Sequence, residues 1–492
     1  MIWVSRFAVL HLVLIFISCS NQTNVPDEVV LAKVGDRVIS VQDFIRRSEY
    51  TIRPDYCRKS NYIHKKIILN SLIAEKLTAL ELDNLKSDEL TDKIDQFSQG
   101  RKEQAMRKRY YHDFYYAKTE LDSTNLNQAF LMSGRTISAK YLNLPEKNIT
   151  RKIFDLLNDG IDIDTIHNSI WNGNAPFKNI NWFDREGPEL RKQLFKKELV
   201  KGEIIGPMLT EDSSYVIIVV EGWSDERLIK DSDLKSRWDD VRNRLVEDVS
   251  KQKYFQKIKS LMRGKHFNLN PKTFYIYANL LSEHYLGDST IKNIIGSSIL
   301  DDNEQTIDML KMINKYDDSI SENSILFSYE NVEWSVGKFH KAIKTHPLVF
   351  RKRKMKSGEF SHQLKYAIAD LLRDIEITKE CYRLGIDEHW SIKANENMWN
   401  DAYLSRIYIN RNKSNTISTN DQYSLNELNP IIDSLQKKYS DKIFINMKKF
   451  ESIVLTDIDM SVIQRGVPFP IVVPSFPRLT TNHRVDYGKN IP

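Results

Sequence analysis

One pattern of residues occurs twice in this chain of 492 amino acids, and the two copies lie 295 positions apart. Both copies, VGDRVISVQDF and YENVEWSVGKF, have the alternation of a strand, a tight turn and a returning strand before the start of a helix. The matched residues are Ser40, Val41, Phe44, Leu69, Ile73, Ala74, Leu77 and Glu81 in the first copy and Ser335, Val336, Phe339, Leu364, Ile368, Ala369, Leu372 and Glu376 in the second. Amphipathicity alone would produce several of these matches, but the shared strand, turn and helix favour a duplicated helical module.

Further segments downstream of each copy also resemble each other. They share an amphipathic stretch, a short strand pattern that begins with lysine, and a phenylalanine four residues later. They are Leu234–Met262 with KHFNLN and Phe274, and Leu428–Tyr439 with KIFIN and Phe450. Each module is therefore expected to end with a helix, a short strand and a terminal helix. We expect residues 226–320 to complete the first module.

Local signals place the elements of the first module. Val29–Val34 has the residue types of a strand, the Gly-Asp pair after it suits a hairpin turn, and Ser40 suits the N-cap of a helix. Apolar residues at helical spacing then predict a helix over 67–82, and another is expected over 90–117.

The N-terminus carries an export signal. Phe7 to Ile17 is a run of apolar residues with one histidine, and these eleven residues fall short of the roughly 20 needed to span a bilayer. The following Ser18-Cys19 resembles a bacterial lipobox, in which the peptidase cuts before a cysteine whose thiol takes a diacylglycerol. This resemblance implies a lipoprotein anchored through Cys19 at the periplasmic face of a bacterial membrane, and Ser20 favours the outer membrane. A plain secretory signal with an incidental cysteine is the alternative.

Composition gives no sign of a cofactor or of nucleic-acid binding. The formal net charge of +6 is mild for this length, and the basic runs Arg101–Arg109 and Arg351–Lys356 suit solvated helix faces. Cys57 and Cys381 lie far apart in sequence, and two cysteines do not make a disulfide framework. No zinc or haem spacing is present, so we expect no metal, no cofactor and no nucleic-acid partner.

Residues 131–225 have the pattern of a small mixed domain between the modules. A strand over Thr136–Leu144 is followed by two helices, the segment Asn181-Trp182-Phe183, a helix over Pro188–Leu199 and a hairpin. The stretch from Leu194 to Gly222 contains the end of that helix and the hairpin. This order resembles the parvulin-type peptidyl-prolyl isomerase domain, a small FKBP-like βαβ fold.

Parvulins have a pair of histidines on their first and last strands, beneath an apolar pocket for proline. The resemblance places Tyr141 and Val216 at these positions, so both expected catalytic histidines are replaced. Isomerisation crosses a barrier of about 18–20 kcal/mol. One tyrosine hydroxyl provides a single hydrogen-bond donor, which is little to lower such a barrier. The catalytic residues therefore stay unknown. The candidates for a peptide-binding surface are Phe183, Leu194, Phe195 and Tyr215. The alternative is that these side chains fill the core of the domain.

The complete layout is similar to the SurA/PrsA class of extracytoplasmic folding factors, whose helical module forms a cradle for unfolded clients. The expected fold class is α+β and mostly helical, with SurA-like helical chaperone modules flanking one small parvulin-like domain. The expected divisions are a signal peptide (1–18), a lipid-anchored tether (19–28), a helical module (29–130), the parvulin-like domain (131–225), a helical arm (226–320), a second module (321–460) and a proline-rich tail (461–492).

This resemblance implies a membrane-tethered chaperone for unfolded or nascent exported or outer-membrane polypeptides, with a parvulin-like domain that does not catalyse isomerisation. Such binding needs exposed apolar surfaces with polar rims and no catalytic residues. Two alternatives stay open. One is an active peptidyl-prolyl isomerase with a non-standard site, and the other is an assembly scaffold for a single dedicated partner.

Overall fold

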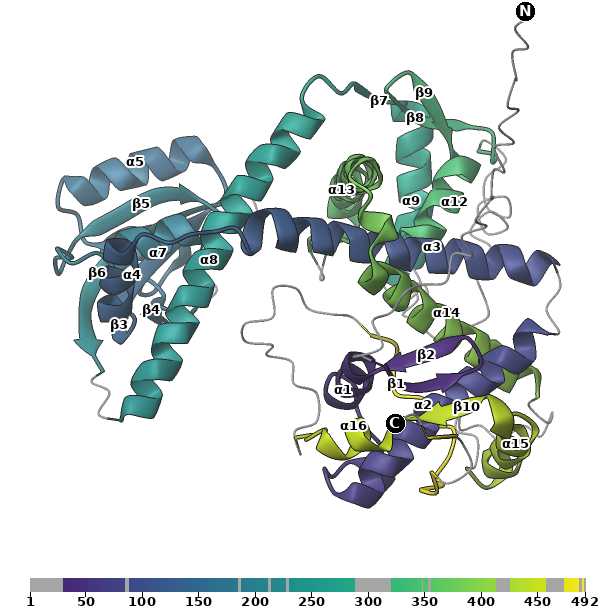
Figure 1. Cartoon of the computed structure of the whole chain (residues 1–492). Coiled ribbons are helices and arrows are strands. Elements are labelled where there is room, and N and C mark those ends of the chain that lie inside the picture. The colour runs from purple at the N-terminus through teal and green to yellow at the C-terminus, as the bar shows by residue number, and fades with distance from the viewer. Residues whose placement is uncertain are drawn as a thin grey trace, which may run out of the picture. The chain divides into compact units, whose positions relative to one another are not determined.

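The computed structural model describes residues 30–84, 88–184, 187–210, 214–226, 230–287, 320–346, 348–352, 355–412, 425–456, 473–485 and 489–490. As expected for an α+β chain, the described part is mostly helical and contains small sheets (Figure 1). The chain forms two compact units. Unit 1 comprises Met1–Lys108, Gly264–Val462 and Ile471–Pro492, and unit 2 comprises Arg109–Arg263 and Ile463–Pro470.

The predicted signal peptide, the tether and Cys19 lie outside the described residues. Among the helices that the structure describes, none combines the length and the apolar character that a membrane span requires.

The first module of unit 1 is formed by segments from the two ends of the chain. Its elements are β1 (Val30–Val34), β2 (Arg37–Ser40), α1 (Val41–Glu49), η2 (Asp55–Cys57), α2 (Tyr62–Asp83), α15 (Leu425–Lys438), η5 (Ser440–Lys442), β10 (Ile443–Ile445), α16 (Met447–Ser452) and β11 (Lys489–Asn490). The sheet order is β11-β10-β1-β2, with β11 parallel to β10 and the other pairs antiparallel. The rings of Phe44 in α1 and Phe450 in α16 meet edge to face in the core, with centroids 6.0 Å apart.

The second module of unit 1 has the same plan. Its elements are β7 (Phe267–Leu269), α9 (Pro271–Gly287), β8 (Ile325–Tyr329), β9 (Val332–Ser335), α12 (Val336–Thr345) and α13 (Ser357–Arg383). The sheet order is β7-β8-β9, and both pairs are antiparallel. Phe274, Phe339 and Phe360 lie fully buried in its core.

Equivalent elements of the two modules begin at equivalent positions of the chain. Each strand of the second hairpin, and the helix after it, begins 295 positions after its counterpart in the first. Ser40 and Ser335 both cap their helices, because each side chain accepts a hydrogen bond from a backbone N–H in the first turn. The strands β10 and β7, which we call the closing strands, pair with the two hairpins in the same register. Ala32 pairs with Ile445, and its counterpart Phe327 pairs with Leu269.

The closing segments are exchanged relative to the expected divisions. We expected residues 226–320 to complete the first module, but β7 pairs with β8 of the second module, and β10 from the C-terminal part pairs with β1. The local patterns do not distinguish these two strands, so only the tertiary structure shows which hairpin each one joins. Ile443 of β10 is fully buried, and a phenylalanine at its place, as β7 would supply, would overfill that core.

Two further helices follow, of which the first packs against both modules and the second packs against α2 of the first module. They are α3 (Asp88–Tyr111) and α14 (Trp390–Arg411), with the 3₁₀ turn η4 (Ile386–Glu388) before α14. On α3, the ring of Phe97 stacks on Tyr403 of α14, with centroids 4.5 Å apart. Gly100 of α3 lies so close to the end of α12 that a Cβ there would overlap the carbonyl oxygen of Thr345. The close packing of α3 on the second module therefore requires glycine at this position.

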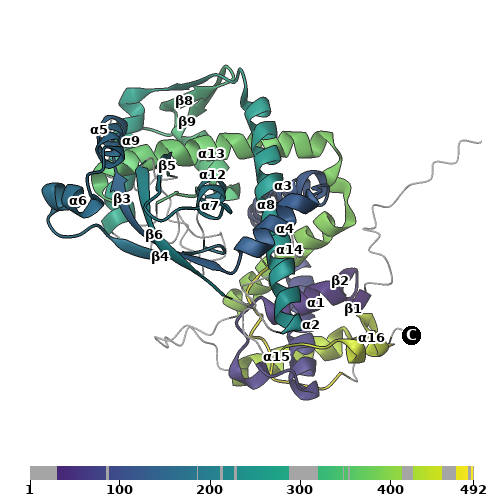
Figure 2. The ribbon, with the colours of Figure 1, turned by 90° about the vertical axis from the view of Figure 1, so that its left-hand side faces the viewer.

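Unit 2 contains the small mixed domain in the predicted order. Its elements are η3 (His112–Tyr116), α4 (Ser123–Met132), β3 (Arg135–Leu144), α5 (Lys147–Asn158), α6 (Ile163–Trp171), β4 (Phe177–Asn181), α7 (Pro188–Leu194), β5 (Ile204–Leu209), β6 (Tyr215–Asp225) and α8 (Asp231–Met262). The sheet order is β4-β3-β6-β5, antiparallel throughout. α5 and α6 cover one face of the sheet and α7 covers the other (Figure 2).

Two helix boundaries in this region differ from the sequence expectation. The helix expected over Pro188–Leu199 ends at Leu194, because Phe195 adopts a non-helical conformation as its C-cap. The helix expected over 90–117 ends at Tyr111 and continues as the π-helical turn η3. In both segments the side-chain spacing alone gives no stop signal, since the residues that follow are ordinary helix formers.

The substitution Gly100→Ala tests the packing of α3 on α12. We expect it to lower the free energy of unfolding by about 2 kcal/mol, because the added methyl group forces the two helices apart. The measurement is urea unfolding of the full chain, followed by tryptophan fluorescence. The matched control is Gly358→Ala in α13, where a Cβ would meet no atom within 4 Å. Equal unfolding midpoints for Gly100→Ala and the wild type would contradict this packing.

Candidate polypeptide-binding sites

One face of the unit 2 sheet carries the two positions at which the parvulin resemblance expects histidines. Tyr141 on β3 lies opposite Ile218, and Val216 on the adjacent strand β6 lies opposite Asn143. Both side chains are partly buried and pack against the apolar cluster that α7 shares with the sheet. Because Val216 has no ionisable group, these two positions provide apolar contacts and one hydroxyl.

His167 lies on the other side of the same sheet. It belongs to α6, where its Nδ1 atom is 2.9 Å from the carbonyl oxygen of Gly173 and its ring packs against Trp171. Since α6 covers the face opposite to Tyr141, His167 does not take the place of a missing histidine.

The four residues predicted to line a peptide-binding surface do not gather at one place. Leu194 and Phe195 are buried in the core of the sheet face under α7. Phe183 is 42% exposed in the turn after β4, where its ring meets Trp182 edge to face at 5.0 Å. Tyr215 begins β6, and strand alternation places it on the face of α5 and α6. Neighbouring residues of a strand face opposite sides of the sheet, so Tyr215 does not share the face of its neighbour Val216.

A different set of residues, in the first module, holds an extended polypeptide. The segment 473–485 forms no helix or strand and lies against α2 and α15 (Figure 1, yellow trace). Asn70 on α2 donates from Nδ2 to two carbonyl oxygens of this segment, at 2.6 Å to Asn482 and 2.7 Å to Arg484. Arg47 on α1 donates to the carbonyl oxygen of Ser475 at 2.8 Å.

The charge of Arg47 is compensated inside the module. Its guanidinium makes two hydrogen bonds to the carboxylate of Glu75, at 2.9 and 2.7 Å, and both side chains are buried. A bidentate pair of this kind satisfies the carboxylate and fixes the direction of the guanidinium. A further N–H of Nη2 donates to the Ser475 carbonyl, so the pair orients a hydrogen-bond donor toward the extended segment.

Two apolar side chains of the same segment are anchored in the core. Phe476 is buried in the cluster formed by α1, α2, α16 and the sheet, and Leu479 is buried among Ala74, Leu428 and Ile432. The polar groups between them are also paired, because Asn429 on α15 accepts from the backbone N–H of Thr481 at 3.1 Å. The segment is thus held by main-chain hydrogen bonds and by apolar anchors, and we call the residues Arg47, Asn70 and Asn429 the tail site.

The residues after α16 are held by the same means. Lys65 donates from Nζ to the carbonyl oxygen of Ile453 at 2.8 Å, and Arg53 donates to that of Thr456 at 2.9 Å. The carboxylate of Glu49 accepts from the backbone N–H of Thr456 at 2.7 Å. Charged side chains of the first module therefore bind backbone groups along two extended stretches of the C-terminal part.

The tail site was not predicted from the sequence, although a signal for it exists. Asn70 and Ser71 are fully buried on α2, in the middle of the apolar residues that form the core. Buried polar side chains need hydrogen-bond partners, so an asparagine on an otherwise apolar helix face indicates a contact with another segment. The sequence did not reveal which segment, because the partner lies about 400 positions further along the chain.

The substitution Asn70→Ala tests the tail site. It leaves two carbonyl oxygens of the segment 473–485 without their donor, so we expect amide hydrogen exchange in this segment to accelerate about tenfold, from a loss of about 1–2 kcal/mol. Mass spectrometry of exchanged peptides measures this rate. The control is Asn412→Ala, which removes an exposed hydrogen bond to the carbonyl oxygen of Tyr408 in its own helix. Unchanged exchange in Asn70→Ala would show that the segment is held without Asn70.

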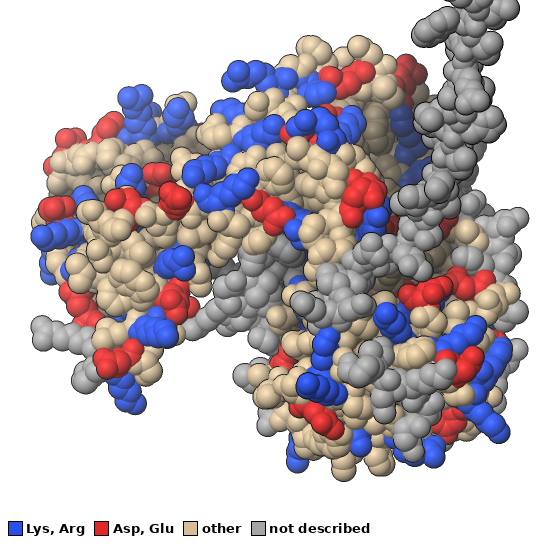
Figure 3. All heavy atoms as spheres, viewed as in Figure 1, with Lys and Arg blue, Asp and Glu red and all other residues tan. Residues whose placement is uncertain are grey.

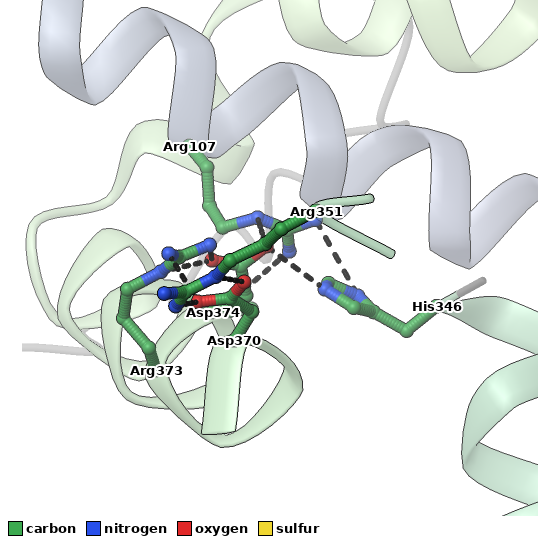
Figure 4. A network of polar contacts seen from close by, with 7 residues as sticks. Arg107, His346, Arg351, Asp370, Arg373 and Asp374 are labelled. Carbon is green, nitrogen blue, oxygen red and sulfur yellow. Dashed lines mark hydrogen bonds and ion pairs between the residues drawn. The ribbon is translucent and has the colours of Figure 1, made fainter. Parts of the chain in front are cut away.

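A second polar cluster joins α3 to the second module (Figure 4). His346, at the end of α12, lies with Nε2 3.2 Å from Oδ2 of Asp374 and with Nδ1 3.4 Å from Nη2 of Arg107. Arg107 also donates to the hydroxyl of Thr378 at 2.7 Å, and Arg373 donates to Asp374 at 2.7 Å. A proton on Nε2 suits this geometry, because Nε2 then donates to Asp374 while Nδ1 faces the donor Nη2 of Arg107.

Asp374 is the anionic centre of this cluster. Burial raises the pKa of Asp374, but the hydrogen bond from His346 and the charges of Arg107 and Arg373 outweigh it and bring the pKa from 3.8 to about 2. A carboxylate whose pKa is lowered on folding stabilises the fold above its ordinary pKa and loses this contribution as the pH falls toward the lowered value.

The pH dependence of Asp374→Asn tests this contribution. At pH 7 we expect the substitution to lower the free energy of unfolding by about 2 kcal/mol. The difference from the wild type should shrink as the pH falls from about 4 to about 2, as urea unfolding at several pH values would measure. The control is Asp55→Asn, since the side chain of Asp55 is 87% exposed in a surface pair that contributes little. A difference that stays constant down to pH 3 would contradict the expectation.

On the face in Figure 3, basic and acidic side chains are interspersed over each unit. A surface of this kind imposes little charge selection on a bound polypeptide.

Comparison with known proteins adds little to this picture. No family model matches the chain, and no curated protein matches it. Among solved structures, the foldase protein PrsA from Streptococcus pneumoniae is similar at 16% sequence identity and a TM-score of 0.21, over 44% of this chain and 86% of that one.

Proposed function

We propose that the protein is an extracytoplasmic, membrane-tethered folding factor that binds unfolded exported or outer-membrane polypeptides. The observation that carries this proposal is the tail site, at which Arg47 and Asn70 hold an extended segment by its main-chain carbonyl oxygens. Main-chain groups are common to all polypeptides, so a surface of this chemistry accepts extended chains of many sequences. The bound segment contains Pro474 and Pro477, which keep it extended and outside helices.

Exposed apolar side chains supply the second requirement of such a protein. Unit 2 exposes Phe177, Leu209 and Trp171 by 57%, 65% and 43%, and unit 1 exposes Val454 by 88%. Scattered exposed apolar residues are ordinary on protein surfaces, and they provide weak contacts that an unfolded client can use in several alignments.

We propose that the small domain of unit 2 is parvulin-like and does not catalyse isomerisation. Its order of elements and its strand order β4-β3-β6-β5 support the resemblance, and Tyr141 and Val216 stand where histidines are expected. Without a histidine pair under the sheet face, the domain has little means to stabilise a twisted amide.

Membrane tethering is part of the same proposal. It rests on the apolar run Phe7–Ile17 and on Ser18-Cys19, which resembles a lipobox. A diacylglycerol on Cys19, with a further acyl chain, would give stable anchoring, because one chain alone binds a membrane only marginally. The polar residues up to Glu28 would then reach at most about 30 Å from the lipid.

Suppression of aggregation by the full chain tests the folding-factor proposal. Several unrelated chemically unfolded proteins are diluted from denaturant with and without the chain, and light scattering records their aggregation. We expect suppression for most of them, because the exposed apolar residues make contacts that do not depend on the sequence of the client. Suppression of none would overturn the proposal and favour a scaffold for one dedicated partner.

A proline-peptide isomerisation assay separates the folding factor from an active isomerase. We expect the full chain to give no acceleration over the uncatalysed rate, whose barrier of about 18–20 kcal/mol comes from amide resonance. The matched variant is Tyr141→Phe, which removes a hydroxyl and keeps the ring. Acceleration that disappears in Tyr141→Phe would establish an isomerase with a non-standard site.

A further inference from the structure

The two modules differ at one edge of their sheets. In the first module β11 lies along β10, with Phe444 paired to Lys489 and Ile445 to Asn490. In the second module β7 takes the place of β10, and among the described residues no strand pairs with its outer edge. The duplicated plan therefore has a fourth strand in one copy and, over the described chain, three strands in the other.

The backbone groups of β7 that face the open edge follow from the pairing with β8. The carbonyl oxygen of His266 accepts from the N–H of Glu330 at 3.0 Å, and the N–H of Asn270 donates to Leu326 at 3.0 Å. In an antiparallel pair, residues that bond to the neighbour alternate with residues that face away. The N–H and C=O groups of Phe267 and Leu269 therefore point toward the open edge. By the same alternation, Ile443 and Ile445 face β11 in the first module.

Side-chain exposure distinguishes the two edges. Ile443 is fully buried, whereas its counterpart Phe267 is 41% exposed. The ring of Phe267 is the outer member of an aromatic ladder, since it lies 5.4 Å from Phe327, whose ring stacks on Trp334 at 5.3 Å. A strand added beside β7 would cover this ring, as cross-strand partners do within a sheet.

We propose that the β7 edge, from Phe267 to Leu269, receives an extended segment of an unfolded client polypeptide as a fourth strand. Main-chain groups of the client pair with Phe267 and Leu269, and an apolar client side chain covers the ring of Phe267, as in other strand additions. β11 on β10 shows that this module design seats such a segment. The inference rests on the proposed function and names one site at which it operates.

The choice of a client as the occupant follows from the rest of the chain. The tail strand that fills the equivalent place in the first module is already paired with β10, so neither this chain nor a second copy has that strand to offer. The β7 edge is short, with three residues, but it carries neither proline nor lysine, two residue types that close an edge against other chains. By contrast, the edge strand β5 of unit 2 contains Pro207.

Two substitutions of Phe267 distinguish the contribution of its ring to client binding from that of its backbone N–H. Phe267→Ala removes the ring and keeps the N–H, whereas Phe267→Pro removes both and leaves the bonds of His266 and Asn270 to β8 in place. The probe is fluorescein-labelled, reduced and carboxymethylated α-lactalbumin, and fluorescence anisotropy gives the affinity. We expect about threefold weaker binding for Phe267→Ala and about fivefold further weakening for Phe267→Pro. Phe255→Ala, which removes a ring that is 60% exposed on α8, should bind like the wild type.

Hydrogen exchange of the unmodified chain gives an independent readout, also if Phe267→Pro fails to fold. We expect the amides of Phe267 and Leu269 to exchange about tenfold more slowly when the probe is bound. Binding without this protection, or equal affinity of Phe267→Ala and a folded Phe267→Pro, would overturn the inference and leave the proposed function standing. Protection without probe that grows with protein concentration, together with dimers in sedimentation, would overturn it in favour of a second copy. No binding by the wild type would overturn both.

Discussion

The pairing of β10 with β1 is the contact on which the first module depends. It joins a strand near the C-terminus to a hairpin at the start of the described chain, and it buries Ile443 and Ile445 completely. α15 and α16 flank β10, so this pairing also sets the helix α15 that, with α2, contacts the extended segment 473–485. Ordering so long a loop costs only modestly more than a short one, and the buried core offsets that cost.

Recognition of the main chain is the common theme of unit 1. Buried Arg47, oriented by Glu75, and buried Asn70 donate to carbonyl oxygens, and apolar anchors supply the remaining contact area. A buried ion pair is weak evidence for stability by itself, since desolvation opposes it. Its value here lies in the direction that it gives to a donor. The same logic applies to the open β7 edge, where backbone groups face outward without regard to sequence.

The candidate sites divide according to how well residue patterns predict them. Tyr141 and Val216 were placed on the first and last strands of the small domain, and they do lie there, on adjacent strands. Tyr215 was grouped with Phe183 and Phe195, but the period of two along β6 sends it to the other face. Asn70 on its apolar helix face indicates a contact with another segment, but the sequence does not reveal that this segment lies about 400 positions further along the chain.

The amino-acid sequence by itself determined the local elements and the duplication. Turn residues, serine caps and apolar spacing act over a few positions, so β1, β2, α1 and their counterparts begin where their residues predict. Tertiary structure alone decided which closing strand meets which hairpin, and where the proline-containing tail lies. Both strands carry the same pattern, and one physical difference between them is volume, because a phenylalanine in the fully buried place of Ile443 would overfill that core. Such complementarity exists only between segments brought together by folding.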